Sequence, residues 1–140
     1  MDNPIWARLH GGSTHFPIAL LLSSLLFDFL GFFLRREPLS RDLHVAGFYA
    51  LLLGTLGSFA AVLSGLMLTH WETLGKGGLR THHLFLWPAF ALLVGLAVWR
   101  LVVREHAGRS AFGAYLVVAV VAAGLMAAAG YWGGEMLLGG

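Results

Sequence analysis

Four long apolar runs constrain this chain more than any other feature of its sequence. They cover about residues 14–34, 44–70, 81–104 and 111–138. Each run reaches the roughly 20 mostly apolar residues that a helix needs to cross a bilayer. Of the 140 residues, 58% are hydrophobic and 11% are charged, and a soluble domain of this size cannot bury so much apolar surface. The sequence therefore predicts an all-α, integral-membrane four-helix bundle, with residues 1–140 forming a single transmembrane domain in contact with membrane lipid.

The basic residues predict how this bundle is oriented. One side of the membrane holds six arginines, in the first and third loops and the adjoining helix end: Arg35, Arg36, Arg41, Arg100, Arg104 and Arg109. The other side holds Arg8, Lys76 and Arg80. Because cytoplasmic loops carry the excess of Lys and Arg, we expect an N-out/C-out topology. The net charge of only +2 gives no indication of nucleic-acid binding.

Histidines gather at the predicted outer level. Five of the seven lie there, from three of the four expected helices: His10, His15, His70, His82 and His83. Glu135 follows near the end of the fourth helix. Imidazole is a good ligand for haem iron, zinc or copper, and four-helix bundles build cofactor sites from side chains on facing helices. The pattern indicates a cofactor site at the outer face.

The absence of cysteine narrows the choice of cofactor. It excludes covalent c-type haem and iron–sulfur clusters on cysteine, so any haem is b-type with two histidine ligands. His15 and His83 are the predicted axial pair, because both lie just inside an apolar run, and His70 and His10 are the reserves. His82 and His83 point about 100° apart on a helix, so only one of them faces a given site well.

Other interpretations of the same histidines stay open. Zinc or copper could bind at the outer face, in which case Glu135 and His10 matter more. Each histidine alone is also a common interfacial residue that needs no metal. The chain could be a structural subunit that packs in a larger membrane complex, because its second apolar run carries a stripe of small residues that favours close helix packing.

Asp28 is an ionisable residue inside the first apolar run. Such a residue is costly in a membrane and is usually paired or functional. By their level in the membrane, Arg100, Arg104 and His44 are within reach. A structural ion pair is the preferred interpretation, and a role in proton relay is the alternative.

Several motifs resemble those of the DUF2231 family of predicted four-helix bacterial membrane proteins, and the resemblance covers nearly the whole chain. The most specific motif is His10-x4-His15-Phe16-Pro17-Ile18-Ala19-Leu20. The others are Leu26-Phe27-Asp28, a histidine that opens the third helix, and Gly130-x-x-Gly133-Gly134-Glu135. The family pattern falls on His10, His15, Asp28, His82 or His83, Gly133 and Gly134. This sequence departs from the family pattern at Gly11, where the family often has proline, and in the residues that follow Glu135.

The resemblance implies a multi-pass protein of the bacterial inner membrane. Similar domains are joined to Rieske or cytochrome c modules, which implies electron transfer at the outer face. Together with the histidines, this predicts a membrane electron-transfer subunit that binds haem b and exchanges electrons with quinone or a redox partner. We expect that the chain is not an enzyme by itself but a subunit of a membrane oxidoreductase complex.

Overall fold

The fold is entirely helical in the part of the chain that the computed structural model describes, residues 4–34 and 37–138. Its elements are α1 (Pro4–Phe33), α2 (Leu39–Leu68), α3 (Gly77–Val103), a short 3₁₀ turn (Arg104–His106) and α4 (Arg109–Leu138). Each of the four α-helices is long and apolar enough to cross a membrane. The predicted all-α fold of four membrane-spanning helices is confirmed.

The first helix begins about ten residues earlier than the sequence suggests. Ser13 and Thr14, the expected N-terminal caps, lie well inside α1. Their hydroxyls donate to carbonyls one turn back, from Ser13 to His10 (3.2 Å) and from Thr14 to Gly11 (3.1 Å). Serine and threonine commonly bond to preceding carbonyls inside a helix, so the same side chains suit both positions. This extension makes His10 a helical residue.

The other helices also start earlier than expected. α2 starts at Leu39 instead of His44, and α3 starts at Gly77 instead of Thr81. The Thr81 hydroxyl donates to the Gly77 carbonyl (3.4 Å) and so does not cap the helix. The shortened connection between α2 and α3 is held by the Trp87 indole, whose Nε1 donates to the Thr73 carbonyl (2.7 Å).

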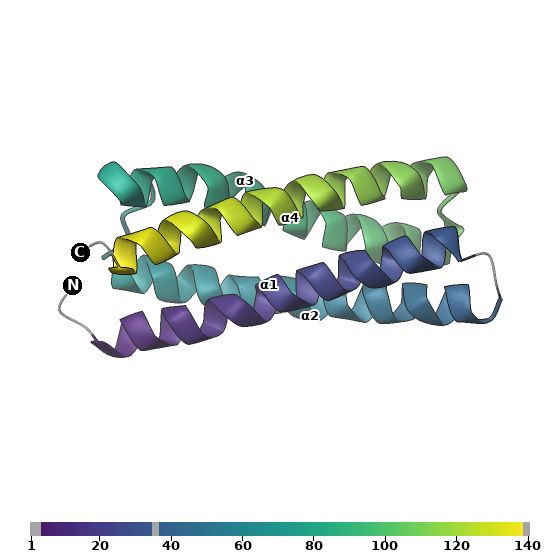
Figure 1. The fold of residues 1–140 in the computed structure, drawn as a ribbon, viewed down its shortest axis with the longest axis horizontal. Coiled ribbons are helices and arrows are strands. Elements are labelled where there is room, and N and C mark those ends of the chain that lie inside the picture. Colours follow the sequence, from purple (N-terminus) through teal and green to yellow (C-terminus); the bar gives the residue numbers. More distant parts are fainter. Residues whose placement is uncertain (1–3, 35–36, 139–140) are drawn as a thin grey trace.

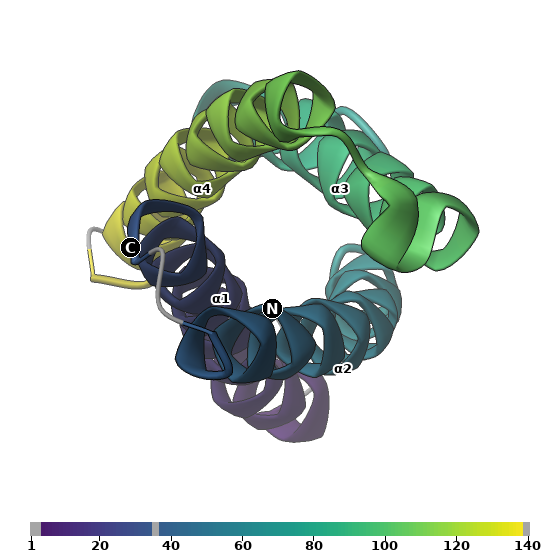
Figure 2. The same cartoon turned by 90° about the vertical axis from the view of Figure 1, so that its right-hand side faces the viewer.

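The helices form two antiparallel hairpins. α1 packs mainly against α2 and α3 mainly against α4, and among the neighbouring helices α2 and α3 have the smallest contact. In Figure 1 the α1–α2 hairpin lies below the α3–α4 hairpin, and Figure 2 shows the four helices arranged around a common axis. Small residues permit the close α1–α2 approach, since a Cβ at Gly54 would lie 3.1 Å from the Leu20 Cβ.

The two ends of the bundle differ in their polar residues. The histidine end holds His10 of α1 and His82 and His83 of α3. The arginine end holds Arg41 at the start of α2 and Arg104 after α3. Arg35 and Arg36, two of the six arginines that predict the orientation, lie outside the described residues.

The core lies between these two ends. It consists mainly of leucines and alanines from all four helices, together with Tyr115 and Met126, and Leu21, Leu51, Leu93 and Ala122 are nearly inaccessible. Many large apolar side chains instead point outward along the helices, including Leu56, Leu84 and Val117. An outer surface of this kind is stable in contact with lipid chains, as expected for a membrane protein.

Candidate functional site

Histidines from two hairpins line one cavity at the histidine end. The cavity has a volume of about 230 Å³. Its wall is mainly apolar and contains four imidazoles, those of His10, His15, His82 and His83. The structure thus brings together four of the five histidines that the sequence places at this level.

The His10 ring is anchored on α2. Its Nδ1 lies 3.0 Å from the Ala61 carbonyl, to which it donates, and 3.2 Å from the Ser64 hydroxyl. Gly65 makes room for the ring, because a Cβ there would lie 2.9 Å from the His10 Cε1. The second nitrogen, Nε2, makes no hydrogen bond to any described residue. A ring held by Nδ1 with a free Nε2 is the arrangement typical of histidines that bind metals.

The His82 ring is anchored in the same way on α4. Its Nδ1 donates to the Ala129 carbonyl at 2.7 Å. A Cβ at Gly133 would lie 3.2 Å from this nitrogen, so the glycine leaves space for the ring. In residues 4–34 and 37–138, nothing forms a hydrogen bond with the Nε2 of His82. Two imidazoles from different hairpins therefore carry a free Nε2 at one cavity.

His83 lies beside His82, and its side chain is almost completely buried, with 4% exposed. The centres of the two imidazole rings are 5.5 Å apart, and the Trp87 ring is 5.9 Å from that of His83 on the other side. The Nδ1 of His83 is buried without a hydrogen-bond partner among the described residues. A buried polar atom without a partner is costly, so this ring has an unused capacity to bind a ligand.

The other predicted site residues are less enclosed. His15 is exposed at the edge of the cavity. His70 is exposed in the connection after α2, outside the cavity lining, and Glu135 is exposed on α4, also outside it. The structure thus places His15 and His83, the predicted axial pair, at one cavity and leaves His70 and Glu135 apart from it.

A metal site with three protein ligands is not formed by the described residues. No group of three or more His, Asp or Glu side chains there is arranged to hold a metal ion. Structural zinc sites take four ligands, and catalytic zinc takes three from the protein. The described part of the histidine end therefore lacks the three protein ligands that such a zinc site needs.

Asp28 is the centre of a second polar cluster, near the arginine end. Its side chain is fully buried, and it receives contacts from the other three helices. Arg100 Nη1 donates to Oδ2 at 2.7 Å, Tyr115 donates to the same oxygen at 2.9 Å, and His44 Nδ1 lies 3.1 Å from Oδ1. The structure thus pairs Asp28 with Arg100 and His44, two of its three expected partners, and no contact joins it to Arg104 among the described residues.

The sequence analysis missed two parts of this cluster. The first is Tyr115 of α4, whose hydroxyl donates to the Asp28 Oδ2. The second is Gly47 of α2, where a Cβ would lie 2.7 Å from the Asp28 Oδ1. A glycine whose level matches that of a buried carboxylate on the neighbouring helix is the signal that could have identified this contact.

Comparison with known proteins assigns the chain to a family. The model of DUF2231, described as a predicted membrane protein, matches residues 7–139. No curated protein and no solved structure matches the chain. The matched segment includes both polar clusters and all four helices. The chain therefore belongs to the DUF2231 family of predicted membrane proteins.

Proposed function

We propose that this protein is a membrane electron-transfer subunit that holds a b-type haem at its histidine end. The observation that carries this proposal is the pair of anchored imidazoles, His10 on α1 and His82 on α3, each with Nδ1 bound to a backbone carbonyl and Nε2 free. When bound, such a haem supplies one-electron transfer.

The number of available ligands favours haem over zinc or copper held by the protein alone. Haem iron needs only two axial ligands, because the porphyrin supplies the other four. His10 and His82 meet that need from different helices, and His83 lies beside them as a third imidazole. The sequence-based pair, His15 and His83, lines the same cavity and stays the competing assignment. His15 has no hydrogen bond to a described residue that would fix its ring, which is why the anchored pair is preferred.

The cavity at the histidine end is small for a haem. About 230 Å³ is less than the roughly 300–1,000 Å³ of typical small-molecule sites. Haem binding therefore requires the two hairpins to separate at this end. The small contact between α2 and α3 makes this seam the easiest one to open.

The charge distribution supports a periplasmic location for the histidine end. Excess arginine at the opposite end favours a histidine end that faces the periplasm of a bacterial inner membrane. In that position the subunit exchanges electrons with quinone or with another subunit of a redox complex. The chain's own residues bind and orient the cofactor, and a partner supplies or accepts the electrons.

The proposal is tested by spectra of the purified full chain after expression with excess haem. We expect a b-type α-band in the reduced-minus-oxidised spectrum and a low-spin ferric signal in electron paramagnetic resonance. His10→Ala and His82→Ala should each remove the low-spin signal, whereas the control His70→Ala should keep it.

Two further variants locate the ligands. Loss of the signal in His15→Ala and His83→Ala, with His10→Ala unaffected, would assign the axial ligands to the sequence-based pair. A wild-type protein without any b-type band after haem supply would overturn the proposal and leave a structural subunit as the better interpretation.

A further inference from the structure

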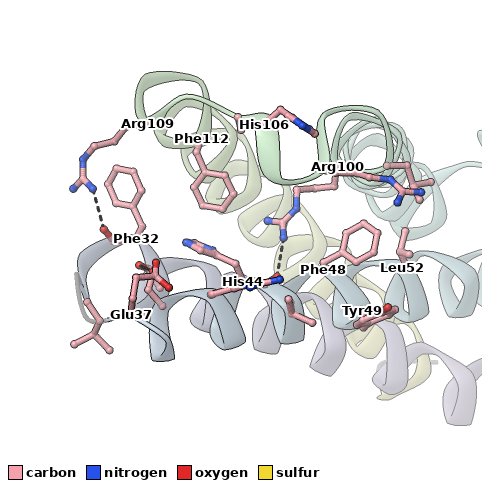
Figure 3. Close-up of a pocket in the computed structure, with 18 residues that line it drawn as sticks. Phe32, Glu37, His44, Phe48, Tyr49, Leu52, Arg100, His106, Arg109 and Phe112 are labelled. Atoms are coloured by element: carbon pink, nitrogen blue, oxygen red, sulfur yellow. Dashed lines mark hydrogen bonds between the residues drawn. The ribbon is translucent and has the colours of Figure 1, made fainter.

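The arginine end contains a much larger cavity than the histidine end. Its volume is about 1100 Å³, and residues from all four helices line it. Figure 3 shows Arg100, Arg109 and Phe112 of the α3–α4 hairpin above His44 and Phe48 of α2. Because both hairpins contribute lining residues, the cavity lies between them.

The polar part of this lining is strongly basic. It contains four arginines and two histidines, but only one described carboxylate, that of Glu37: the basic residues are Arg41, His44, Arg100, Arg104, His106 and Arg109. Such an excess of positive charge attracts anions, and the attraction is stronger in a site that is partly shielded from water.

Most of these guanidinium groups have unused hydrogen-bonding capacity. Within the described residues, the side chains of Arg41 and Arg104 form no ion pair and no hydrogen bond. Arg109 has one long hydrogen bond, from Nη1 to the Phe32 carbonyl (3.4 Å), and stacks on the Phe32 ring. Arg100 is buried, with 4% exposed, and its Nε has no described partner. The guanidinium donors of Arg41, Arg104 and Arg109 are free to bind a ligand, and phosphate matches their planar, forked geometry.

The rest of the lining is apolar and continues toward the middle of the bundle. Val45, Phe48 and Leu52 of α2 face this space together with Leu101 of α3. A soluble anion would leave this wall uncovered, whereas the acyl chain of a lipid would cover it. Basic pockets between membrane helices are known to bind phosphate-bearing lipid headgroups.

From these contacts we infer that the arginine-end cavity binds a phosphate group and that its source is the headgroup of an acidic phospholipid. Arg41, Arg104 and Arg109 bind the phosphate, and the apolar wall takes the acyl chain. This inference does not depend on haem binding, because the two sites lie at opposite ends of the bundle.

The test measures lipid binding to the purified full chain in a neutral detergent by native mass spectrometry. The probes are phosphatidylglycerol, phosphatidylcholine and inorganic phosphate. We expect phosphatidylglycerol to bind at least about tenfold more tightly than phosphatidylcholine, which corresponds to roughly one charge-assisted contact. The double variant Arg41→Gln/Arg104→Gln should lose this preference.

The matched control is Arg8→Gln/Arg80→Gln, which removes the same charge from two exposed arginines at the histidine end. It should keep the preference. Equal binding of the two lipids would overturn the inference, because the cavity would then show no preference for an acidic headgroup. Equal loss in both double variants would also overturn it, since net charge alone would then explain the preference. Displacement of phosphatidylglycerol by millimolar inorganic phosphate would keep the phosphate site but assign it to a soluble anion.

Discussion

Both ends of the bundle bury polar side chains, but the buried carboxylate at one end is fully paired, whereas the imidazoles at the other end are only partly paired. Near the arginine end, both oxygens of Asp28 are used, by His44, Arg100 and Tyr115. At the histidine end, His10 and His82 use one ring nitrogen each, and His83 has a buried nitrogen without a described partner. Burying an unpaired polar group costs free energy. The comparison indicates that Asp28 holds the helices together, whereas the histidines are available to a ligand.

The largest effect should follow from Asp28→Asn. The change leaves the Arg100 charge buried without its counter-charge, and breaking a buried ion pair costs about 3–5 kcal/mol. We expect a loss of this size in the free energy of unfolding, measured by titration with a denaturing detergent. Glu135→Gln is the control at the other end, because its carboxylate is exposed and unpaired in the described chain. Equal stability of Asp28→Asn and Glu135→Gln would contradict the structural role of Asp28.

A smaller loss should follow from Tyr115→Phe. The variant keeps the ring, which stacks on Trp99 with centroids 5.2 Å apart, and removes only the hydrogen bond to Asp28. Hydrogen bonds to charged groups contribute about 1.5–3 kcal/mol, and we expect that loss in the same unfolding titration. Tyr131→Phe, at an exposed tyrosine of α4, should have no measurable effect. A Tyr115→Phe protein as stable as Tyr131→Phe would show that this contact contributes nothing.

Gly47→Ala tests the space that α2 leaves for the carboxylate. The added Cβ would lie 2.7 Å from the Asp28 Oδ1, and an overpacked core typically loses about 1–3 kcal/mol. Gly124→Ala is the matched control, because a Cβ there meets nothing within 4 Å. We expect a lower melting temperature for the first variant alone. Equal melting temperatures would mean that Asp28 can move aside at no cost.

The smallest effect is expected at the histidine end, for His83→Leu in the haem-free protein. Leucine fills most of the ring's space and removes the buried nitrogen that lacks a partner. We therefore expect the free energy of unfolding to change by less than about 1 kcal/mol, or to rise. A loss as large as that of Asp28→Asn would show that His83 has a structural partner, and the contrast between the two ends would disappear.

The sequence predicts the depth of residues in the membrane better than the direction in which they point. Depth follows from position along a helix, at 1.5 Å per residue. This is why His44 and Arg100 could be identified as partners of Asp28, and why four histidines share one cavity. The family and the four membrane-spanning helices could also be predicted, since both depend on long apolar runs and local motifs.

Direction depends on how each helix is rotated, and these helices give few clues to it. They are apolar almost all round, so no polar face marks the side that points to lipid. His10 and His15 are five residues apart, which places them about 140° apart around α1. Only the packing of α1 on α2 decides that His10 is the anchored ring. The contact between Tyr115 and Asp28 was not predicted for the same reason, because the sequence does not show how α4 is rotated.

The central claim is that imidazoles from two hairpins share one ligand, and haem content tests it most directly. The measurement is the ratio of haem to protein in the purified full chain, by the pyridine haemochromogen assay. The account predicts about one haem per chain in the wild type and in His70→Ala, and almost none in His10→Ala/His82→Ala. A wild-type protein without haem, or the same haem content in all three proteins, would contradict it.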